Sequence, residues 1–303
     1  MRRAIALLFL LLFFLAGCEK ETDLADRLPR SSIELTDGYC LVAGDQVVLN
    51  HHDISVYDYG AHLLYLKDHI SCESLLENSA SFKVYASGEE VSTVGTHPGY
   101  SSSFPSTDPF IWTQPTFYEV YISPFSSISS LGGRAGVSVD TREDPRIVAA
   151  LKKYGQYRGG LHCEILSCNY SDPGEVILKL KLSNRDEVNY YYMDPEKMGM
   201  GLFHYFTNGL FLRNDEELYS NHVEHMQPVP WDAWEQKWMS LLKGGSSVTI
   251  TLEYKNFDTV PPGSYRALFR FPGLSHVDRD QLAQRSGQIW LGELQLYKEV
   301  VLD

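Results

Sequence analysis

Three stretches in the C-terminal half of the chain alternate apolar and polar residues with a period of two. They are residues 176–182, 248–254 and 265–271. In the first, Lys179 and Lys181 fall on the face opposite the leucines. A strand turns successive side chains to opposite faces, so this period gives each strand one dry face and one wet face. Several such strands separated by turns predict an antiparallel β-sandwich.

Turn residues flank these strands in an order that resembles a known group of domains. Gly244-Gly245 precedes the second stretch, and Pro261-Pro262-Gly263 connects it to the third. The pattern Gly-Gly-x-x-Val-x-Ile-x-Leu followed by Pro-Pro-Gly-x-Tyr-x-x-x-Phe-x-Phe resembles the last hairpin of immunoglobulin-like domains of exported bacterial proteins. It is also similar to small bacterial proteinase-inhibitor domains. The resemblance implies an immunoglobulin-like β-sandwich over residues 160–303, closed by a strand within residues 289–302.

The residues before this sandwich predict a second, N-terminal domain at residues 33–158. Its apolar and β-branched runs have strand lengths and are separated by Asp, Asn, Gly and Ser. The runs cover residues 39–43, 47–49, 54–66, 82–86 and 117–122. We therefore expect a mostly β protein, in which an N-terminal β or α+β domain precedes the immunoglobulin-like sandwich.

One helix is expected to close the N-terminal domain, at about residues 145–154. Asp144 can cap it, Pro145 suits its first position and Gly155 suits its exit. The apolar stripe of this helix is formed by Ile147, Val148, Leu151 and Tyr154. Gly159-Gly160 is then interpreted as a hinge between the two domains.

A long segment at residues 92–115 is rich in Ser, Pro, Gly and Thr. Its four prolines argue against a helix or a central strand, so an ordered loop is expected there. The loop contains four aromatic residues, Tyr100, Phe104, Phe110 and Trp112. These side chains either hold the loop against the core or form an exposed recognition patch.

Three tryptophans recur near residue 230. Trp231, Trp234 and Trp238, followed by Leu241 and Leu242, predict a short amphipathic helix between Pro230 and Gly244. They either cover a core or form a partner-binding face, since tryptophan is enriched at interface hot spots.

The N-terminus has the order of a secretion signal. Arg2 and Arg3 precede an apolar run that is shorter than a membrane-spanning helix requires. The sequence Leu15-Ala16-Gly17-Cys18 resembles the lipobox of bacterial lipoproteins. The resemblance implies removal of residues 1–17, lipidation of Cys18 and a tether at residues 18–32. Glu19 after the cysteine resembles lipoproteins that pass to the outer membrane.

Charge restricts the partners of such a mature chain. Removal of residues 1–17 takes away two arginines and no acids, which changes the formal net charge from −13 to −15. Nucleic acid and anionic lipid headgroups would be repelled. Membrane contact is therefore expected through the lipid on Cys18 alone.

Four cysteines remain after Cys18: Cys40, Cys72, Cys163 and Cys168. An even number in an exported chain permits disulfides, and pairing within domains would give Cys40–Cys72 and Cys163–Cys168. The alternative is that they are small buried apolar side chains. No CxxC motif or Cys/His cluster is present, so no structural zinc is expected.

No catalytic motif is found in the sequence. GxSxG, Walker and GxGxxG patterns are absent, and no cofactor is expected. His222-x-Glu224-His225 and His51-His52-Asp53 lack the spacing of a His-Glu-x-x-His zinc motif. The acidic group Asp140, Glu143 and Asp144 lacks the spacing of a calcium loop and is better explained by helix capping.

These observations together predict a non-catalytic, lipid-anchored protein of the bacterial cell envelope. Its role would be binding or assembly, with an envelope protein or a glycan as the partner. A proteinase or hydrolase inhibitor of the envelope is the alternative. A third hypothesis is an envelope hydrolase whose catalytic groups lie far apart in the sequence.

Overall fold

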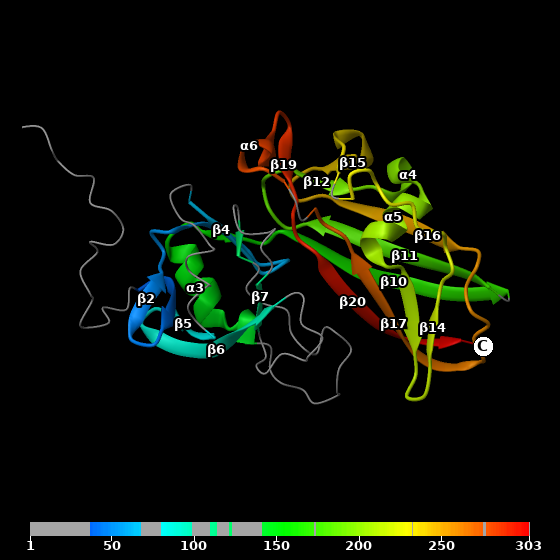
Figure 1. Cartoon of the computed structure of the whole chain (residues 1–303), viewed down its shortest axis with the longest axis horizontal. Helices are drawn as coiled ribbons and strands as arrows, with labels where there is room; N and C mark the ends of the chain where they lie inside the picture. Colours follow the sequence, from blue (N-terminus) through cyan, green and yellow to red (C-terminus); the bar gives the residue numbers. More distant parts are fainter. Residues whose placement is uncertain are drawn as a thin grey trace, which may run out of the picture.

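The computed structural model describes residues 37–67, 80–98, 110–113, 121–122, 141–172, 174–231, 233–274 and 277–302. Strands dominate these residues and the described helices are short, so the prediction of a mostly β protein is confirmed. Figure 1 shows the N-terminal strands, blue to cyan, beside a larger body coloured green to red. None of the described helices is long and apolar enough to cross a bilayer. The N-terminal anchor and tether predicted for residues 1–32 lie outside the described residues.

Two sheets form the N-terminal half. The first has the strand order β2-β1-β5-β6-β7, made of Gln46–Leu49, Tyr39–Ala43, Ser81–Ala86, Glu89–Pro98 and Phe110–Thr113. The second has the order β8-β4-β3-β9, made of Tyr121–Ile122, Leu63–Leu66, Ile54–Asp58 and Tyr157–Arg158. The apolar run at residues 54–66 is therefore a hairpin, because Gly60 and the positive φ of His62 turn the chain between β3 and β4.

The predicted helix is α3, Pro145–Lys153. The Asp144 side chain accepts a hydrogen bond from the backbone N–H of Arg146, Pro145 is at the first turn, and Gly155 has a φ of +67°. Ile147 and Leu151 are buried with Leu41 and Phe82 in one apolar cluster. The helix start follows the local sequence, as expected. The buried stripe is confirmed only for Ile147 and Leu151: Ala150 is buried as well, Val148 is partly buried, and Tyr154 is exposed at the helix end.

The prediction of a loop over residues 92–115 is wrong at both of its ends. β6 continues to Pro98 and pairs in parallel with β7, so residues 92–98 and 110–113 are strands. Pro98 is tolerated because it is the last residue of β6, where the ladder ends. Tyr100 and Phe104 lie outside the described residues.

The C-terminal half contains the predicted sandwich. One sheet has the order β10-β11-β16, made of Leu161–Asp172, Glu175–Asn184 and Ser247–Tyr254. The other has the order β14-β13-β17-β20, made of Leu218–Ser220, Leu210–Arg213, Gly263–Phe271 and Leu294–Leu302. All pairs within both sheets are antiparallel. The chain crosses between the sheets after β11, β14 and β16, which is the Greek-key connectivity of immunoglobulin-like folds.

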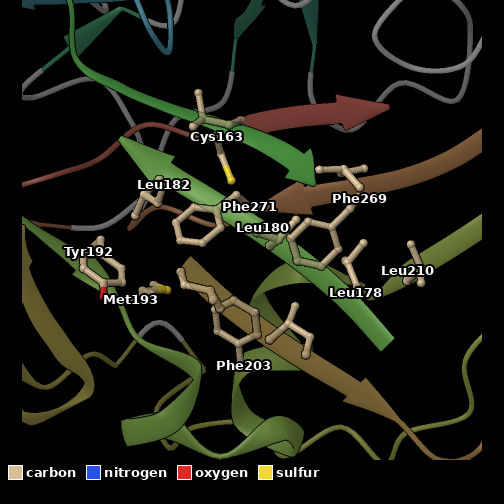
Figure 2. Close-up of a cluster of buried hydrophobic side chains, with 14 of the residues drawn as sticks. Cys163, Leu178, Leu180, Leu182, Tyr192, Met193, Phe203, Leu210, Phe269 and Phe271 are labelled. Carbon is tan, nitrogen blue, oxygen red and sulfur yellow. The ribbon is translucent and has the colours of Figure 1, made fainter. Parts of the chain in front are cut away.

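Alternation decides which side chains fill the sandwich. Figure 2 shows Leu178 and Leu180 of β11 facing Phe269 and Phe271 of β17, with Phe203 closing one side. Phe203 belongs to α5, Met200–Thr207, and its ring meets that of Phe271 edge-on at 6.3 Å. Burial of each such side chain contributes about 1.5–3 kcal/mol to stability.

A further sheet caps this sandwich, with the order β15-β12-β19-β18. Its strands are Met239–Leu242, Tyr190–Met193, Gly287–Ile289 and Ala283–Gln284. Next to it lie α4, Pro195–Met198, and α6, Arg279–Leu282.

The helix predicted between Pro230 and Gly244 is not formed. Among the described residues 230–238, the helical structure is a single 3-10 turn, η5, Gln236–Trp238, before β15. Met239 to Leu242 instead pair with β12, because this pairing buries Met239 and Leu242 against the sandwich core. A non-local strand partner thus overrides the helical spacing of the tryptophans.

The two halves share buried residues at their junction. β4 alternates between them: Leu64 and Leu66 belong to the N-terminal cluster, whereas Leu63 and Tyr65 belong to the cluster of the sandwich. Gly159-Gly160 is tied down at this junction, since the Asp186 carboxylate accepts their backbone N–H groups at 2.6 and 3.0 Å. These bonds hold the two glycines at the junction, and the hinge expected between the domains stays a prediction.

A disulfide between Cys163 and Cys168 is excluded. Both thiols are free and buried on β10. Five residues of extended strand separate their Cα atoms by about 16 Å, whereas a disulfide needs roughly 4.4–6.8 Å. Burial raises the pKa of the Cys163 thiol to about 12 and that of Cys168 to about 11, so both behave as apolar side chains. Cys40 is fully buried in β1, and Cys72 lies outside the described residues.

Candidate functional site

The histidine motifs do not converge on a metal. The His222 imidazole meets the Asp258 carboxylate at 2.7 Å, whereas the His225 ring lies 5.6 Å from the ring of His204. Asp258 also accepts the backbone N–H of Ser220 at 2.7 Å. The hydrogen bond from Ser220, and after it the one from His222, holds the pKa of the Asp258 carboxyl below its usual value. In the part of the chain that the structure describes, no three His, Cys, Asp or Glu side chains form a metal-binding group.

The second histidine motif is a packed turn. The His51 ring stacks on Tyr154 of the helix end at 3.9 Å, and His52 lies 4.0 Å from His51. Asp53 accepts the backbone N–H of Asn50, which closes the turn before β3. Asp144 is used by its helix cap, Glu143 lies in the 3-10 turn before it, and Asp140 lies outside the described residues.

A long connection between β14 and β15 contains three exposed large apolar side chains. We call residues 222–231 and 233–238 the arm. Its first part is held by backbone hydrogen bonds from His222 N–H to Asn256 and from Met226 N–H to Gly201 of α5. The Tyr205 hydroxyl of α5 donates to the Trp231 carbonyl at 3.2 Å. Gly201 permits this approach, because a Cβ there would lie 2.9 Å from the Met226 side chain.

Three apolar side chains of the arm project into solvent. Met226 is 63% exposed, Val229 94% and Trp231 51%. A fixed backbone that presents a methionine, a valine and a tryptophan outward has the composition of a protein-binding surface. Of the three tryptophans for which a partner-binding face was one alternative, Trp231 therefore has an exposed side chain.

The other two predicted tryptophans turn inward. Trp238 is buried, with its ring 6.4 Å from that of Phe206, and Trp234 is partly buried against the sandwich cluster. They anchor the arm to the core, which matches the core-covering alternative of the sequence analysis.

Two of the four aromatic residues predicted near residue 105 can be placed by their backbone. Phe110 and Trp112 lie in β7, the edge strand of the first sheet, where Trp112 pairs with His97. Tyr100 and Phe104 lie outside the described residues, so the recognition patch expected at residues 92–115 stays a prediction.

Met226 and Val229 were not singled out from the sequence. They belong to the segment Met226-Gln227-Pro228-Val229-Pro230, which has no helical or strand period. An apolar residue between two prolines, here Val229, outside any regular pattern, is the available signal for such a projecting segment.

His204 lies beneath the arm, fully buried on α5. Neither ring nitrogen has a hydrogen-bond partner in the described chain, and its ring meets Tyr254 edge-on at 5.2 Å. Burial, and then the neighbouring His225, lower the pKa of His204 to about 4. The imidazole is therefore neutral at physiological pH, which an apolar environment requires.

Comparisons with known proteins add little to these observations. No family model matches the chain, and no curated protein matches it. The solved structures similar to it include a β-glucosidase from Listeria innocua, with 15% identity over 45% of this chain and a TM-score of 0.20. A second structure of that enzyme, in complex with glucose, has 12% identity over 56% of the chain and a TM-score of 0.20. The chain spans only 16% and 20% of those two longer chains.

Proposed function

We propose that this protein is a lipid-anchored component of the bacterial cell envelope that binds a partner protein through the arm. The lipobox-like sequence ending at Cys18 supports the anchor, and residues 18–32 would act as its tether. The role is binding rather than catalysis.

The observation that carries the binding role is the outward projection of Met226, Val229 and Trp231 from a fixed backbone. Burial of these three side chains by a partner would contribute several kcal/mol, at about 1.5–3 kcal/mol for each fully buried apolar side chain. The hydrogen bonds to the Gly201 carbonyl and from the Tyr205 hydroxyl reduce the ordering cost of association, because they already hold the arm in place.

The test is photo-crosslinking in intact envelopes, with the crosslinking residue at position 229. We expect a discrete crosslinked species there and none from position 188, which is apolar, exposed and distant in sequence. Trp231→Ala should abolish the species, whereas Val301→Ala, on an exposed valine of β20, should leave it intact. Equal crosslinking from positions 229 and 188 would contradict a specific arm interface.

The anchor is tested separately. Cys18→Ser should move the protein from the membrane fraction to the soluble fraction. Retention of the Cys18→Ser variant in membranes would overturn the lipid anchor and leave the arm interface standing.

A further inference from the structure

A second exposed surface lies on the sheet β14-β13-β17-β20. In β17, Tyr265, Ala267 and Phe269 face the core, so Arg266, Leu268 and Arg270 face solvent. We call this solvent side the outer face. Its other members are Phe211, Arg213, Leu218, Tyr297, Glu299 and Val301, as the strand registers require.

An apolar row crosses the middle of the outer face. Phe211 pairs with Leu268, and Leu268 pairs with Tyr297, so the three side chains lie next to one another on three strands. Tyr297 is 69% exposed on the edge strand β20. The row therefore extends over two strand spacings, about 10 Å, and ends in an open aromatic ring.

Two ion pairs between neighbouring residues of the outer face and its edge flank this row. Arg266 Nε lies 2.8 Å from Glu299 Oε1, and Arg270 Nε lies 3.2 Å from Glu293 Oε1. The Arg266 guanidinium also lies 5.9 Å from the centre of the Tyr297 ring, which orients the ring on the face. Each guanidinium keeps further N–H donors and each carboxylate keeps further acceptor positions, while the paired charges cancel.

A hollow of about 460 Å³ opens at the other end of the row, beside the turn between β13 and β14. Its apolar lining comes from Phe211, Leu218 and Leu268, and its polar lining from Arg213, Asn214, Asp215, Glu216 and Glu217. The Asn214 side-chain oxygen accepts the N–H groups of Glu216 and Glu217 at 2.9 and 2.7 Å. The turn that carries the carboxylates is thus held in one conformation.

This combination selects among ligand classes. The core of a protein interface is depleted in Asp and Glu, and here three carboxylates line the same hollow as Phe211 and Leu268, which disfavours a protein partner. The same carboxylates, on a chain of net charge −13, repel anionic polymers. A neutral sugar ring presents an apolar C–H face and a rim of hydroxyl donors. Its face fits the Phe211–Leu268–Tyr297 row, and its hydroxyls fit the carboxylate acceptors and guanidinium donors.

We propose that the outer face of the sheet β14-β13-β17-β20 binds a neutral carbohydrate chain. One sugar would occupy the hollow over Phe211 and Leu218, and a following sugar would stack on Tyr297. This surface is separate in residues from the arm, and neither its ligand nor its test depends on the protein partner of the arm.

The test is affinity electrophoresis of the full chain in gels that contain a soluble polysaccharide. Glycogen, dextran, xyloglucan and a soluble β-1,3-glucan serve as neutral probes, and polygalacturonate serves as the anionic counterpart. We expect at least one neutral probe to retard the protein. Tyr297→Ala should weaken that retardation about tenfold, which corresponds to about 1.4 kcal/mol for a lost aromatic contact.

Tyr154→Ala is the matched control, because Tyr154 is an exposed tyrosine of the N-terminal half. Glu217→Gln, at the rim of the hollow, provides a second variant that keeps the shape of the side chain, and it should also weaken the retardation. An unchanged thermal midpoint for each variant would show that the fold is intact.

Four outcomes would overturn carbohydrate binding at this face. They are no retardation by any neutral probe, retardation by polygalacturonate alone, equal weakening by Tyr154→Ala and Tyr297→Ala, and a protein crosslinked at position 297 in place of glycan retardation. Trp231→Ala, which should lose the arm crosslink, should not change the retardation by polysaccharide. Failure of the arm interface can therefore be distinguished from failure of carbohydrate binding.

Discussion

The indole Nε1 of Trp290 donates a hydrogen bond of 3.0 Å to the buried carboxylate of Asp58, from one half of the chain to the other. Asp58 ends β3 in the N-terminal half, and Trp290 follows β19 in the C-terminal half. Asp58 also accepts the backbone N–H of Ala61 at 3.2 Å. The hydrogen bond from Trp290 makes the docking of the two halves specific, because another packing that buried Asp58 and Trp290 apart would leave both groups unpaired.

Asp58 should make stability depend on pH. Burial raises the pKa of its carboxyl to about 6, against the lowering effect of the Ala61 and Trp290 N–H groups. The unfolded chain loses this proton near pH 3.9. The carboxyl therefore contributes stability in full below about pH 4, and the contribution is lost as the pH rises through about 6.

Asp58→Asn should remove that dependence while it keeps an acceptor for Trp290. Urea unfolding of both proteins between pH 4 and 8 measures it, and the variant should gain about 1–3 kcal/mol relative to the wild type across this range. Parallel pH profiles for the two proteins would show that Asp58 titrates normally in the fold.

Gly160 faces the same carboxylate. It has a φ of +67°, and a Cβ at this position would lie 2.0 Å from Asp58 Oδ1. Gly155 also has a φ of +67° but has nothing within 4 Å of such a Cβ, so it is a matched control. Gly155→Ala should cost about 1–2 kcal/mol for the left-handed backbone alone. Gly160→Ala should cost at least about 2 kcal/mol more, because a buried carboxylate must move. Thermal unfolding measures both, and equal losses would exclude the close contact.

His204 should make the protein sensitive to acid. Its pKa in the folded state, about 4, lies below the value of about 6.5 in the unfolded chain. The unfolded state therefore binds the proton first, so stability is full above about pH 6.5 and is lost as the pH falls towards 4.

His204→Phe keeps a ring against Tyr254 and removes two ring nitrogens that have no partner in the described chain. The variant should equal or exceed the wild type by about 1 kcal/mol at pH 7, and by more at pH 5. Chemical unfolding at both pH values measures this difference. His52→Gln, at an exposed histidine, should keep the acid sensitivity of the wild type. A wild-type acid response in His204→Phe would place the sensitive group elsewhere.

Local sequence patterns predicted the elements whose burial and capping depend only on neighbouring residues. The two-residue period of residues 176–182 matches β11, whose Leu178, Leu180 and Leu182 are fully buried. The helix at Pro145 follows from its cap and stripe, which need no distant partner. Local sequence rules were sufficient to predict both the strand and the helix.

Pairing with distant strands could not be predicted in the same way. Residues 239–242 continue the helical spacing of the tryptophans, yet β12, nearly fifty residues earlier, takes them as a strand partner. The exposure of Val229 and Tyr297 likewise depends on what lies opposite them in space. Tyr297 occupies an ordinary outward position of β20, so its row with Phe211 and Leu268 exists only once the sheet is assembled.

Lys298 links the edge strands of the two sandwich sheets by hydrogen bonds. β20 and β10 are edge strands, and β10 has a bulge between Ile165 and Ser167. The Lys298 ammonium donates to the Ile165 and Leu166 carbonyls at 3.0 and 2.6 Å. A lysine at this place satisfies edge carbonyls that would otherwise be open to pairing with another chain.

Lys298→Met keeps the length of the side chain and removes the donor. The free energy of unfolding should fall by about 1–2 kcal/mol, as for hydrogen bonds to a charged donor. Amide exchange in β10 should become faster near the bulge, because its carbonyls lose their fixed partner. Lys181→Met is the control: its ammonium lies 3.6 Å from Glu164 on an exposed face, so its loss should stay within about 0.5 kcal/mol. Similar losses in the two variants would mean that Lys298 acts only as a surface charge and that packing alone holds the sheet edges together.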